Sequence, residues 1–307
     1  MTPRRRLPAL GGGGAVAAAL VLDRLFGEPP AAAHPVVWFG NAMEAVERRL
    51  WADDRGRGVL HTAIGVGLGV TAGALVRSPT IALTVAIAGR ELERAAQRVV
   101  DALRSGDLDR ARAEVPALVG RDPSELDESG LAAAVIESLA ENSVDAVVAP
   151  AFWTVILGAP GAAGYRAVNT MDAMVGHRSP RYERYGWASA RLDDIANWIP
   201  ARLFALLVAS ARPDRGRAIR RAVAEDAPAH PSPNAGVAEA AVAAALGVEL
   251  GGPLRYGDRQ ERRPALGTGP RPDVDDIGAT IAVLRRTQLI MAVGAVLTAM
   301  AGRRLLR

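Results

Sequence analysis

Hydrophobic residues gather into long runs along this 307-residue chain, and charged residues lie in blocks between the runs. A helix needs about 20 apolar residues to cross the hydrocarbon core of a bilayer. The run from Gly58 to Val76 contains no charged residue. The run from Ala146 to Tyr165 contains none either, although Pro150 and Pro160 interrupt it. Shorter apolar runs lie at Leu7 to Leu22, Thr80 to Gly89, Leu203 to Ala211 and Thr287 to Gly302. We therefore expect an all-α, polytopic integral membrane protein with about four to six transmembrane helices.

Three polar stretches separate these runs. Residues 90–141 alternate acidic and basic side chains at helical spacing, as at Glu91, Arg94 and Arg98, which predicts a polar helical insertion. Residues 212–234 are rich in proline and arginine, and residues 251–276 are rich in glycine, proline and arginine, so we expect loops in both. No stretch shows the alternation of a β-strand. The chain, 1–307, is therefore interpreted as a single integral membrane domain.

The composition excludes several kinds of active site. The chain has no cysteine and no lysine. Disulfides, thiolate nucleophiles and zinc–thiolate sites are therefore excluded, as are a lysine-containing phosphate loop and a Schiff-base mechanism. The net charge is +4, but the arginines are dispersed and no aromatic stacking surface accompanies them. We expect no nucleic-acid partner, because arginines beside apolar runs are typical of anchors at a lipid bilayer.

Acidic residues precede the run from Ala146 to Tyr165. Glu137, Glu141 and Asp145 are spaced by four, which on a helix places three carboxylates in one line. Asn142 lies beside them in the sequence. Like charges in such a line repel unless a cation or a basic partner lies among them. The line is either a solvated acidic face or part of a binding site.

A second group of polar residues follows the same run. Its members can ligate a metal or bind phosphate: Asn169, Asp172, Arg191, Asp193, Asp194, Asn197 and Arg202. Asp193 and Asp194 precede Asn197 by four and three positions, so one helical face presents carboxylate and amide oxygens together. Such hard ligands suit Mg²⁺, which takes one or two carboxylates plus phosphate oxygens and waters. Arginines can hold phosphate oxygens through paired hydrogen bonds. Ionisable residues at the edges of membrane spans favour a functional site over a salt-bridged structure.

His34 is a further candidate. It follows a stretch with Gly27, Pro29 and Pro30, which predicts a rigid turn. A lone histidine is more often structural than catalytic, but it is also the side chain best suited to proton transfer near neutral pH. The four histidines include no HExxH pair and no GxSxG elbow is present, so neither a zinc protease site nor a serine hydrolase is indicated.

Several segments together resemble the adenosylcobinamide-phosphate synthase family of cobalamin biosynthesis. The segments are Asp23 to Pro35 (DRLFGEPPAAAHP), Gly120 to Asp122 (GRD), Glu137 to Pro150 (ESLAENSVDAVVAP), Tyr165 to Arg202 (containing YRAVNTMDAMVGH and YGWASARLDDIANWIPAR) and Pro231 to Gly236 (PSPNAG). They span most of the chain in the order of the family, and the stretch to Arg202 is the most specific.

The resemblance implies a multi-pass ligase of the bacterial inner membrane. Such an enzyme amidates adenosylcobyric acid, a corrinoid, with 1-amino-2-propanol or its O-phosphate and gives adenosylcobinamide phosphate. The family is described as consuming ATP with a divalent metal, here taken as Mg²⁺. Other membrane enzymes of the corrinoid pathway are possible partners.

The resemblance and the spacing together give a hypothesis for the site. Asp193, Asp194 and Asn197, with Glu141 or Asp145, would hold Mg²⁺–ATP. Phosphate and substrate groups would be bound by the remaining polar residues: Arg121, Asn142, Asn169, Asp172, Arg191 and Arg202. Glu137 and His34 compete for the role of the base that takes a proton from the amine.

Two other interpretations use the same residues. Asn169 to Asp172 and Asp193 to Asn197 also resemble the paired aspartate motifs of membrane prenyltransferases, which hold a diphosphate through Mg²⁺. A non-catalytic membrane scaffold of the corrinoid pathway is the third interpretation. It predicts that neutralising Asp193 and Asp194 leaves the flux through the pathway unchanged.

Overall fold

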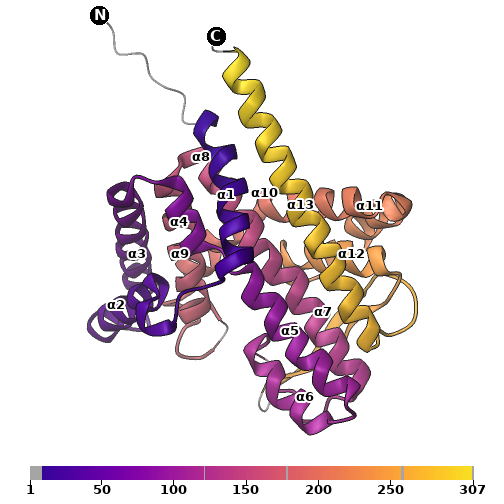
Figure 1. The fold of residues 1–307 in the computed structure, drawn as a ribbon. Helices are drawn as coiled ribbons and strands as arrows, with labels where there is room; N and C mark the ends of the chain where they lie inside the picture. Colours follow the sequence, from indigo (N-terminus) through magenta and orange to yellow (C-terminus); the bar gives the residue numbers. More distant parts are fainter. Residues whose placement is uncertain (1–8, 121, 178, 257–258, 306–307) are drawn as a thin grey trace, which may run out of the picture. The chain divides into compact units, whose positions relative to one another are not determined.

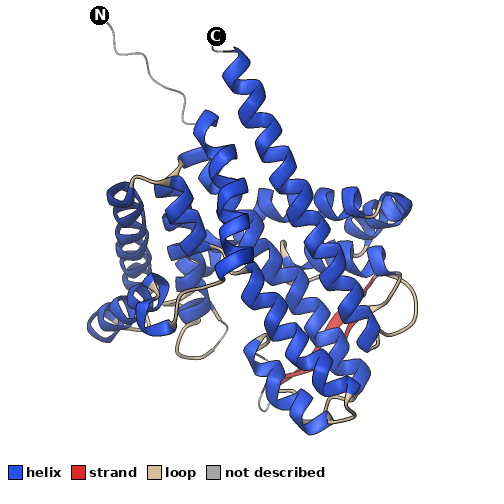
Figure 2. Cartoon of the chain, viewed as in Figure 1, coloured by secondary structure: helices blue, strands red, loops and turns tan. Residues whose placement is uncertain are grey.

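The computed structural model describes residues 9–120, 122–177, 179–256 and 259–305. Nearly all of the secondary structure in them is helical, which confirms the expected all-α class (Figure 2). Among the described residues, the strands are a single antiparallel pair, β1 (Leu250–Tyr256) and β2 (Arg259–Leu266). The helices divide into two compact units, described here as the first and the second unit.

The first unit combines the chain up to Ala88, Asp145–Asn197 and the chain from Met291. Its helices are α1 (Ala9–Phe26), α2 (Pro35–Leu50), α3 (Arg55–Val76), α4 (Pro79–Ala86), α8 (Ala149–Leu157) and α9 (Ala159–Met171), with the start of α10 (Trp187–Ala211) and the end of α13 (Val274–Leu305). Its core lies where α1, α4 and the segment around Val147 meet, and it contains Leu20 and Leu83. Small apolar side chains dominate this core, so the helices approach one another closely.

Glycines let α3 lie directly against α9, its neighbour in Figure 1. A Cβ built on Gly69 would lie 2.6 Å from the Cβ of Ala167, and one built on Gly73 would collide with the carbonyl oxygen of Ala159. Together with Gly65, these glycines recur every four residues and form one stripe along the helix. The close approach therefore depends on the absence of side chains, as in many membrane helix pairs.

Within the described residues, three helices are long and apolar enough to cross a membrane: α3, α10, and α13 over Val274–Ala301. The apolar run from Ala146 to Tyr165, expected as a further span, is divided at Gly158 between α8 and α9. Gly158 has φ +68°, which stops α8, and Pro160 then starts α9. The run therefore does not form one helix: α8 continues α7 and η3 without a break, whereas α9, of thirteen residues, reaches about 20 Å.

The second unit combines Gly89–Val144 with Trp198–Ile290. Its helices are α5 (Gly89–Arg104), α6 (Leu108–Glu114), α7 (Glu128–Ser143), α11 (Gly216–Glu225) and α12 (Ala235–Leu246), with the end of α10 and the start of α13. Every residue from Ala235 to Ala245 is buried. A helix that is apolar on all sides belongs in an interior, and α12 packs against α7 and α11.

Two stretches expected as loops contain regular structure. Residues 212–234 include α11, whose Ile219 and Ala222 are buried one turn apart. Residues 251–276 include most of the β1–β2 hairpin, in which Leu250 pairs with Leu266 and both are fully buried. The glycines that indicated a loop instead form an irregularity in β1, where Gly251 and Gly252 have φ +85° and +105°. Local composition concealed the strands, because their burial depends on residues distant in the sequence.

Short irregular helices join these elements. They are η1 (Ala31–Ala33), η2 (Val115–Ala117), η5 (Pro213–Arg215) and η6 (Ala227–Ala229), which are 3₁₀ helices, and η3 (Val144–Val148) and η4 (Asp172–Gly176), which are π-helices. Each of the two π-helices carries a candidate site residue. Asp145 lies in η3 and Asp172 begins η4.

Candidate functional site

Helices α9 and α10 present a cluster of polar side chains to each other in the first unit. The Asn197 side-chain amide donates to Asp193 Oδ2 at 2.9 Å, one helical turn away. Tyr165 Oη donates to Asn197 Oδ1 at 2.8 Å and lies 3.4 Å from Asp145 Oδ1. Asn169 Nδ2 lies 3.4 Å from Asp193 Oδ1. Spacings of four residues on both helices therefore place these groups on facing surfaces.

The centre of this cluster is closed to solvent. Tyr165 is 4% exposed and Asn197 is 2% exposed. The indole of Trp153 donates to the carbonyl oxygen of Ala196 at 3.1 Å and so ties α8 to α10 beside the cluster. Two hydrogen bonds from amides to its carboxylate hold Asp193 in one orientation. A carboxylate fixed in this way is ready to bind a ligand without further ordering.

Further carboxylates lie around this centre. The carboxylate of Asp172 packs against Gly176. A Cβ built on Gly176 would collide with that carboxylate and would lie 3.4 Å from the Cβ of Ala190 on α10. Asp172 and Asp194 are close enough to Asp193 for their negative charges to repel. Arg191 lies 3.8 Å from Asp194 in an exposed ion pair. Four aspartates, counting Asp145, therefore gather at one place in the first unit.

This donor set fits a magnesium ion that arrives with phosphate. Among the residues that the structure describes, no group of three or more histidines and carboxylates is arranged to hold a metal by itself. Mg²⁺ usually takes only one or two carboxylates and completes its shell with substrate phosphates and waters. Asp193 with a neighbouring aspartate supplies ligands of this kind. A resident metal held by protein alone is not indicated by this geometry.

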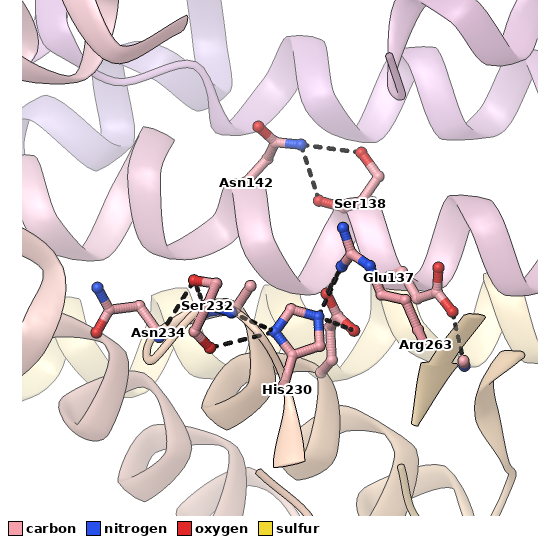
Figure 3. Close-up of polar contacts among 10 residues, drawn as sticks. Glu137, Ser138, Asn142, His230, Ser232, Asn234 and Arg263 are labelled. Carbon is pink, nitrogen blue, oxygen red and sulfur yellow. Dashed lines mark hydrogen bonds and ion pairs between the residues drawn. The ribbon is translucent and has the colours of Figure 1, made fainter. Parts of the chain in front are cut away.

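A second polar cluster lies in the second unit, along α7 (Figure 3). Glu137 is 7% exposed, and its Oε1 accepts a hydrogen bond of 2.8 Å from the backbone N–H of Gly251 in β1. Ser138 donates to the carbonyl oxygen of Leu118 at 2.7 Å. The amide of Asn142 donates to the carbonyl and hydroxyl oxygens of Ser138, each at 2.9 Å. These contacts join α7 to its neighbours within the unit.

The same cluster contains a buried group of opposite charges. The carboxylate of Glu239 on α12 lies 3.6 Å from the guanidinium of Arg263 and 3.8 Å from the ring of His230. Arg263 Nη1 lies 2.6 Å from His230 Nε2. Because arginine can only donate, Nε2 accepts from it, while Nδ1 lies 3.0 Å from the backbone N–H and 3.1 Å from the carbonyl oxygen of Ser232. The group is thus a charge pair with a neutral imidazole.

Glu141 also belongs to this second cluster. It keeps exposed surface, but the surrounding chain reduces the solvation of its carboxyl and raises its pKa. Arg263 acts in the opposite sense, and Glu137 acts in the same sense. Glu141 and Asp145 were expected on one helical face, but the π-helix η3 starts at Val144 between them and shifts the register. The two carboxylates fall in different units.

The sequence-predicted residues therefore separate into two groups. The first unit contains His34, Asp145, Asn169, Asp172, Arg191, Asp193, Asp194 and Asn197. The second unit contains Glu137, Glu141, Asn142 and Arg202. Arg121 lies outside the described residues. Arg202 stacks on Trp198 and lies 3.3 Å from Asn234 Oδ1.

Both candidate bases have structural partners. His34 caps the N-terminus of α2, with its Nδ1 accepting from the N–H of Val36 at 3.2 Å. Its Nε2 lies 3.4 Å from Glu28, and the residue is 6% exposed. Glu137 holds the backbone of Gly251. The choice between these two residues as the base stays a prediction.

Sequence reasoning missed Tyr165, which links Asp145 to Asn197. Its signal was present, because it begins the segment that contains Asn169 and lies four residues before it. The Glu239–Arg263–His230 group carried no comparable signal. Its members lie on three separate segments, and nothing in their spacing indicates that they meet.

Comparison with known proteins gives a consistent result. Residues 16–284 match the family model described as CobD/Cbib protein. The chain is 44% identical over 290 residues to "Cobalamin biosynthesis protein CobD" of Mycobacterium tuberculosis (strain CDC 1551 / Oshkosh), with 90% of this chain and 92% of that protein covered.

Two further relatives give similar matches. The protein with the same description from Rhodobacter capsulatus is 43% identical over 293 residues, covering 87% of this chain and 91% of the relative. The protein from Chromobacterium violaceum is 44% identical over 293 residues, covering 89% and 92%. No solved structure matches the chain.

Proposed function

The chain belongs to the CobD/Cbib protein family of cobalamin biosynthesis, and we propose that it forms the amide bond between a corrinoid carboxylate and an aminopropanol. The acid is adenosylcobyric acid, the amine is 1-amino-2-propanol O-phosphate or the free aminopropanol, and the product is adenosylcobinamide phosphate. The family membership supports the pathway. The observation that supports a reaction centre is the Asp193–Asn197–Tyr165 network in the first unit.

The proposed reaction has two steps. A carboxylate does not react with an amine until one of its oxygens becomes a good leaving group. The corrinoid carboxylate attacks the γ-phosphorus of ATP, which forms an acyl phosphate and releases ADP. The amine nitrogen then attacks the acyl carbon, a base takes the amine proton, and inorganic phosphate leaves. Phosphoryl transfer needs alignment and charge stabilisation more than covalent help from the protein.

Residues of the first unit fit the phosphoryl step. A bound Mg²⁺ would supply positive charge to the phosphate oxygens. Asp193, fixed by the amides of Asn169 and Asn197, presents a carboxylate of defined orientation, and Asp194 or Asp145 would act as its companion. The side chain of Arg191 is 65% exposed, so it can turn toward a phosphate group. These assignments prefer Asp145 to Glu141, because Asp145 contacts Tyr165 of the network.

Localisation in the bacterial inner membrane is part of the proposal. Three helices in the described part of the chain are long and apolar enough to cross a membrane, and a helical protein of this kind fits an inner membrane better than an outer one. The corrinoid substrate would then be processed at the membrane, where other enzymes of the same pathway are possible partners.

The experiment that tests the function uses membranes that contain the full chain. They are incubated with adenosylcobyric acid, Mg²⁺–ATP and aminopropanol phosphate, and the corrinoid products are identified by mass spectrometry. We expect a product heavier by the aminopropanol phosphate less one water, formed only with ATP. An isoprenoid diphosphate added in parallel tests the prenyltransferase interpretation.

Asp193→Asn is the informative variant, because it keeps the shape of the side chain and removes its charge. We expect turnover to fall about 100-fold, the size of effect seen when metal-binding groups are altered. Asp53→Asn is the matched control, since Asp53 is exposed and pairs with Arg184 in the same unit. Unchanged flux in Asp193→Asn would favour a non-catalytic scaffold.

A further inference from the structure

An apolar cavity lies within the first unit, enclosed by α2, α3, α4 and α9. Figure 1 shows α3, α4 and α9 side by side. The cavity has a volume of about 160 Å³. Its lining is almost entirely apolar and includes Phe39, Leu68, Ala72, Ile81 and Val85. Apolar cavities of this size stay dry and accept small apolar groups, because water finds too few polar partners in them.

One charged residue, Arg166 of α9, lines this cavity. The Nε atom of Arg166 is buried and, within the described parts of the chain, has no hydrogen-bond partner. None of the described residues forms an ion pair with its guanidinium either. A guanidinium has five donors and cannot lose its charge in a protein, so leaving it unsatisfied beside apolar surface is costly. Arg166 is half-buried, and its buried Nε is free within the described residues to donate to an anionic group that enters the cavity.

The rim of the cavity is apolar and exposed. Leu68 is 46% exposed, Val76 is 45% exposed and Ile81 is 58% exposed, although all three line the cavity. Leu68 and Val76 belong to α3, which is long and apolar enough to cross a membrane. In a bilayer, such a surface faces acyl chains rather than water. The cavity is thus open to the hydrocarbon side of the protein.

We propose that this cavity binds one acyl chain of an anionic phospholipid, whose phosphate is held by Arg166. An acyl chain is the apolar group that surrounds a membrane helix, and the phosphate supplies the anion that the guanidinium requires. A free phosphate would satisfy Arg166 and leave the cavity empty. A water could bond only at Arg166 and Thr170, because the rest of the lining is apolar. The inference is independent of the proposed amide synthesis, since the cavity uses none of the residues assigned to that reaction.

The test measures bound lipid on the full chain. The protein is purified in detergent, and its lipid adducts are measured by native mass spectrometry during titration with phosphatidylglycerol. Phosphatidylcholine with the same acyl chains tests the need for net negative charge, and glycerol 3-phosphate tests the need for the acyl chain. We expect a one-to-one adduct with phosphatidylglycerol, a weaker one with phosphatidylcholine, and none with glycerol 3-phosphate.

Two variants remove the two halves of the site. Arg166→Gln should weaken phosphatidylglycerol binding by about tenfold, because one charge-assisted hydrogen bond is lost. Its matched control is Arg48→Gln, an exposed arginine of the same unit. Ala72→Phe should fill the cavity and weaken binding by a similar factor. Its matched control is Ala74→Phe, which is exposed on the same helix and does not line the cavity.

The results separate the proposal from its alternatives. Retention of phosphatidylglycerol by both Arg166→Gln and Ala72→Phe would overturn it. Loss in Ala72→Phe with no change in Arg166→Gln would overturn the phosphate contact. Equal binding of glycerol 3-phosphate would show an anion site without a lipid, which also contradicts the proposal.

Discussion

The two polar clusters of this protein contain the same kinds of residues but balance charge differently. The first cluster contains four aspartates, Asp193 among them. Two asparagine amides and a tyrosine hydroxyl lie between them, and Arg191 forms an exposed ion pair with Asp194. Around Glu239, one buried carboxylate has both Arg263 and His230 within 4 Å. Buried charges that face fixed opposite charges are typical of structure. Asp172 and Asp194 repel Asp193, and carboxylates gathered in this way are typical of a site that receives a cation.

The difference between the clusters predicts opposite effects of mutation. Changes at the Glu239 cluster should reduce the stability of the fold, because they leave a buried charge without compensation. Changes at the Asp193 cluster should reduce turnover and leave stability nearly unchanged, because they relieve repulsion. Each prediction below tests one side of this distinction.

The largest effect is expected from Glu239→Ala. Glu239 is 1% exposed, and its removal takes away the buried carboxylate that lies 3.6 Å from the guanidinium of Arg263. Breaking a buried ion pair in this way costs about 3–5 kcal/mol. We expect a large fall in the melting temperature of the detergent-solubilised protein, measured by circular dichroism. Glu225→Ala is the control, since Glu225 is exposed and pairs with Arg221, and it should change stability by less than about 1 kcal/mol.

If Glu239→Ala left the melting temperature unchanged and abolished turnover, the assignment of the two clusters would be reversed. The second cluster would then contain the reaction centre. Glu137, which lies on the neighbouring α7 and holds the backbone of Gly251, would become the stronger candidate for the base.

Tyr165→Phe should give a smaller effect, on turnover. The variant removes the hydroxyl that donates to Asn197 Oδ1 at 2.8 Å and keeps the aromatic ring in place. A single buried hydrogen bond contributes about 1 kcal/mol, so turnover should fall roughly five- to tenfold. We expect the Mg²⁺ concentration that gives half-maximal turnover to rise, because Asn197 also orients Asp193.

A purely structural role of Tyr165 would give a different result. The melting temperature would fall while the half-saturating Mg²⁺ concentration stayed constant. Tyr182→Phe is a suitable comparison, because that hydroxyl donates to Glu47 at 2.9 Å in the same unit, away from the proposed metal ligands.

The sequence predicts some features of this molecule because they depend on local pattern. The uncharged run ending at Val76 becomes α3, and the spacing of Asp193 and Asn197 places them on one face of α10. Other features depend on contacts that the pattern does not contain. The β1–β2 hairpin is tied to Glu137, more than one hundred residues before it. The break at Gly158 depends on a positive φ that glycine permits but does not require.

The separation of Glu141 from Asp145 is the most instructive failure of local pattern. Spacing by four places two residues on one face only if the helix keeps its α-helical register. The π-helix from Val144 to Val148 changes that register, and no residue type in VDAVV signals it. Of the carboxylates proposed for the metal site, Glu141 therefore lies in the second unit, whereas Asp145, Asp193 and Asp194 lie in the first.

Glu141→Gln should give the smallest effect, and it tests this separation directly. The pKa of Glu141 is raised above its ordinary value of 4.5, chiefly because the fold reduces its solvation. The folded state therefore holds this proton more tightly than the unfolded state, so Glu141 lowers stability as the pH rises from about 4.5 through its folded pKa. Glutamine should remove the part of this loss of stability that Glu141 causes. The melting temperature should then depend less steeply on pH, while turnover persists. A loss of turnover as large as in Asp193→Asn would instead place Glu141 among the metal ligands, and the division between a structural and a functional cluster would fail at this residue.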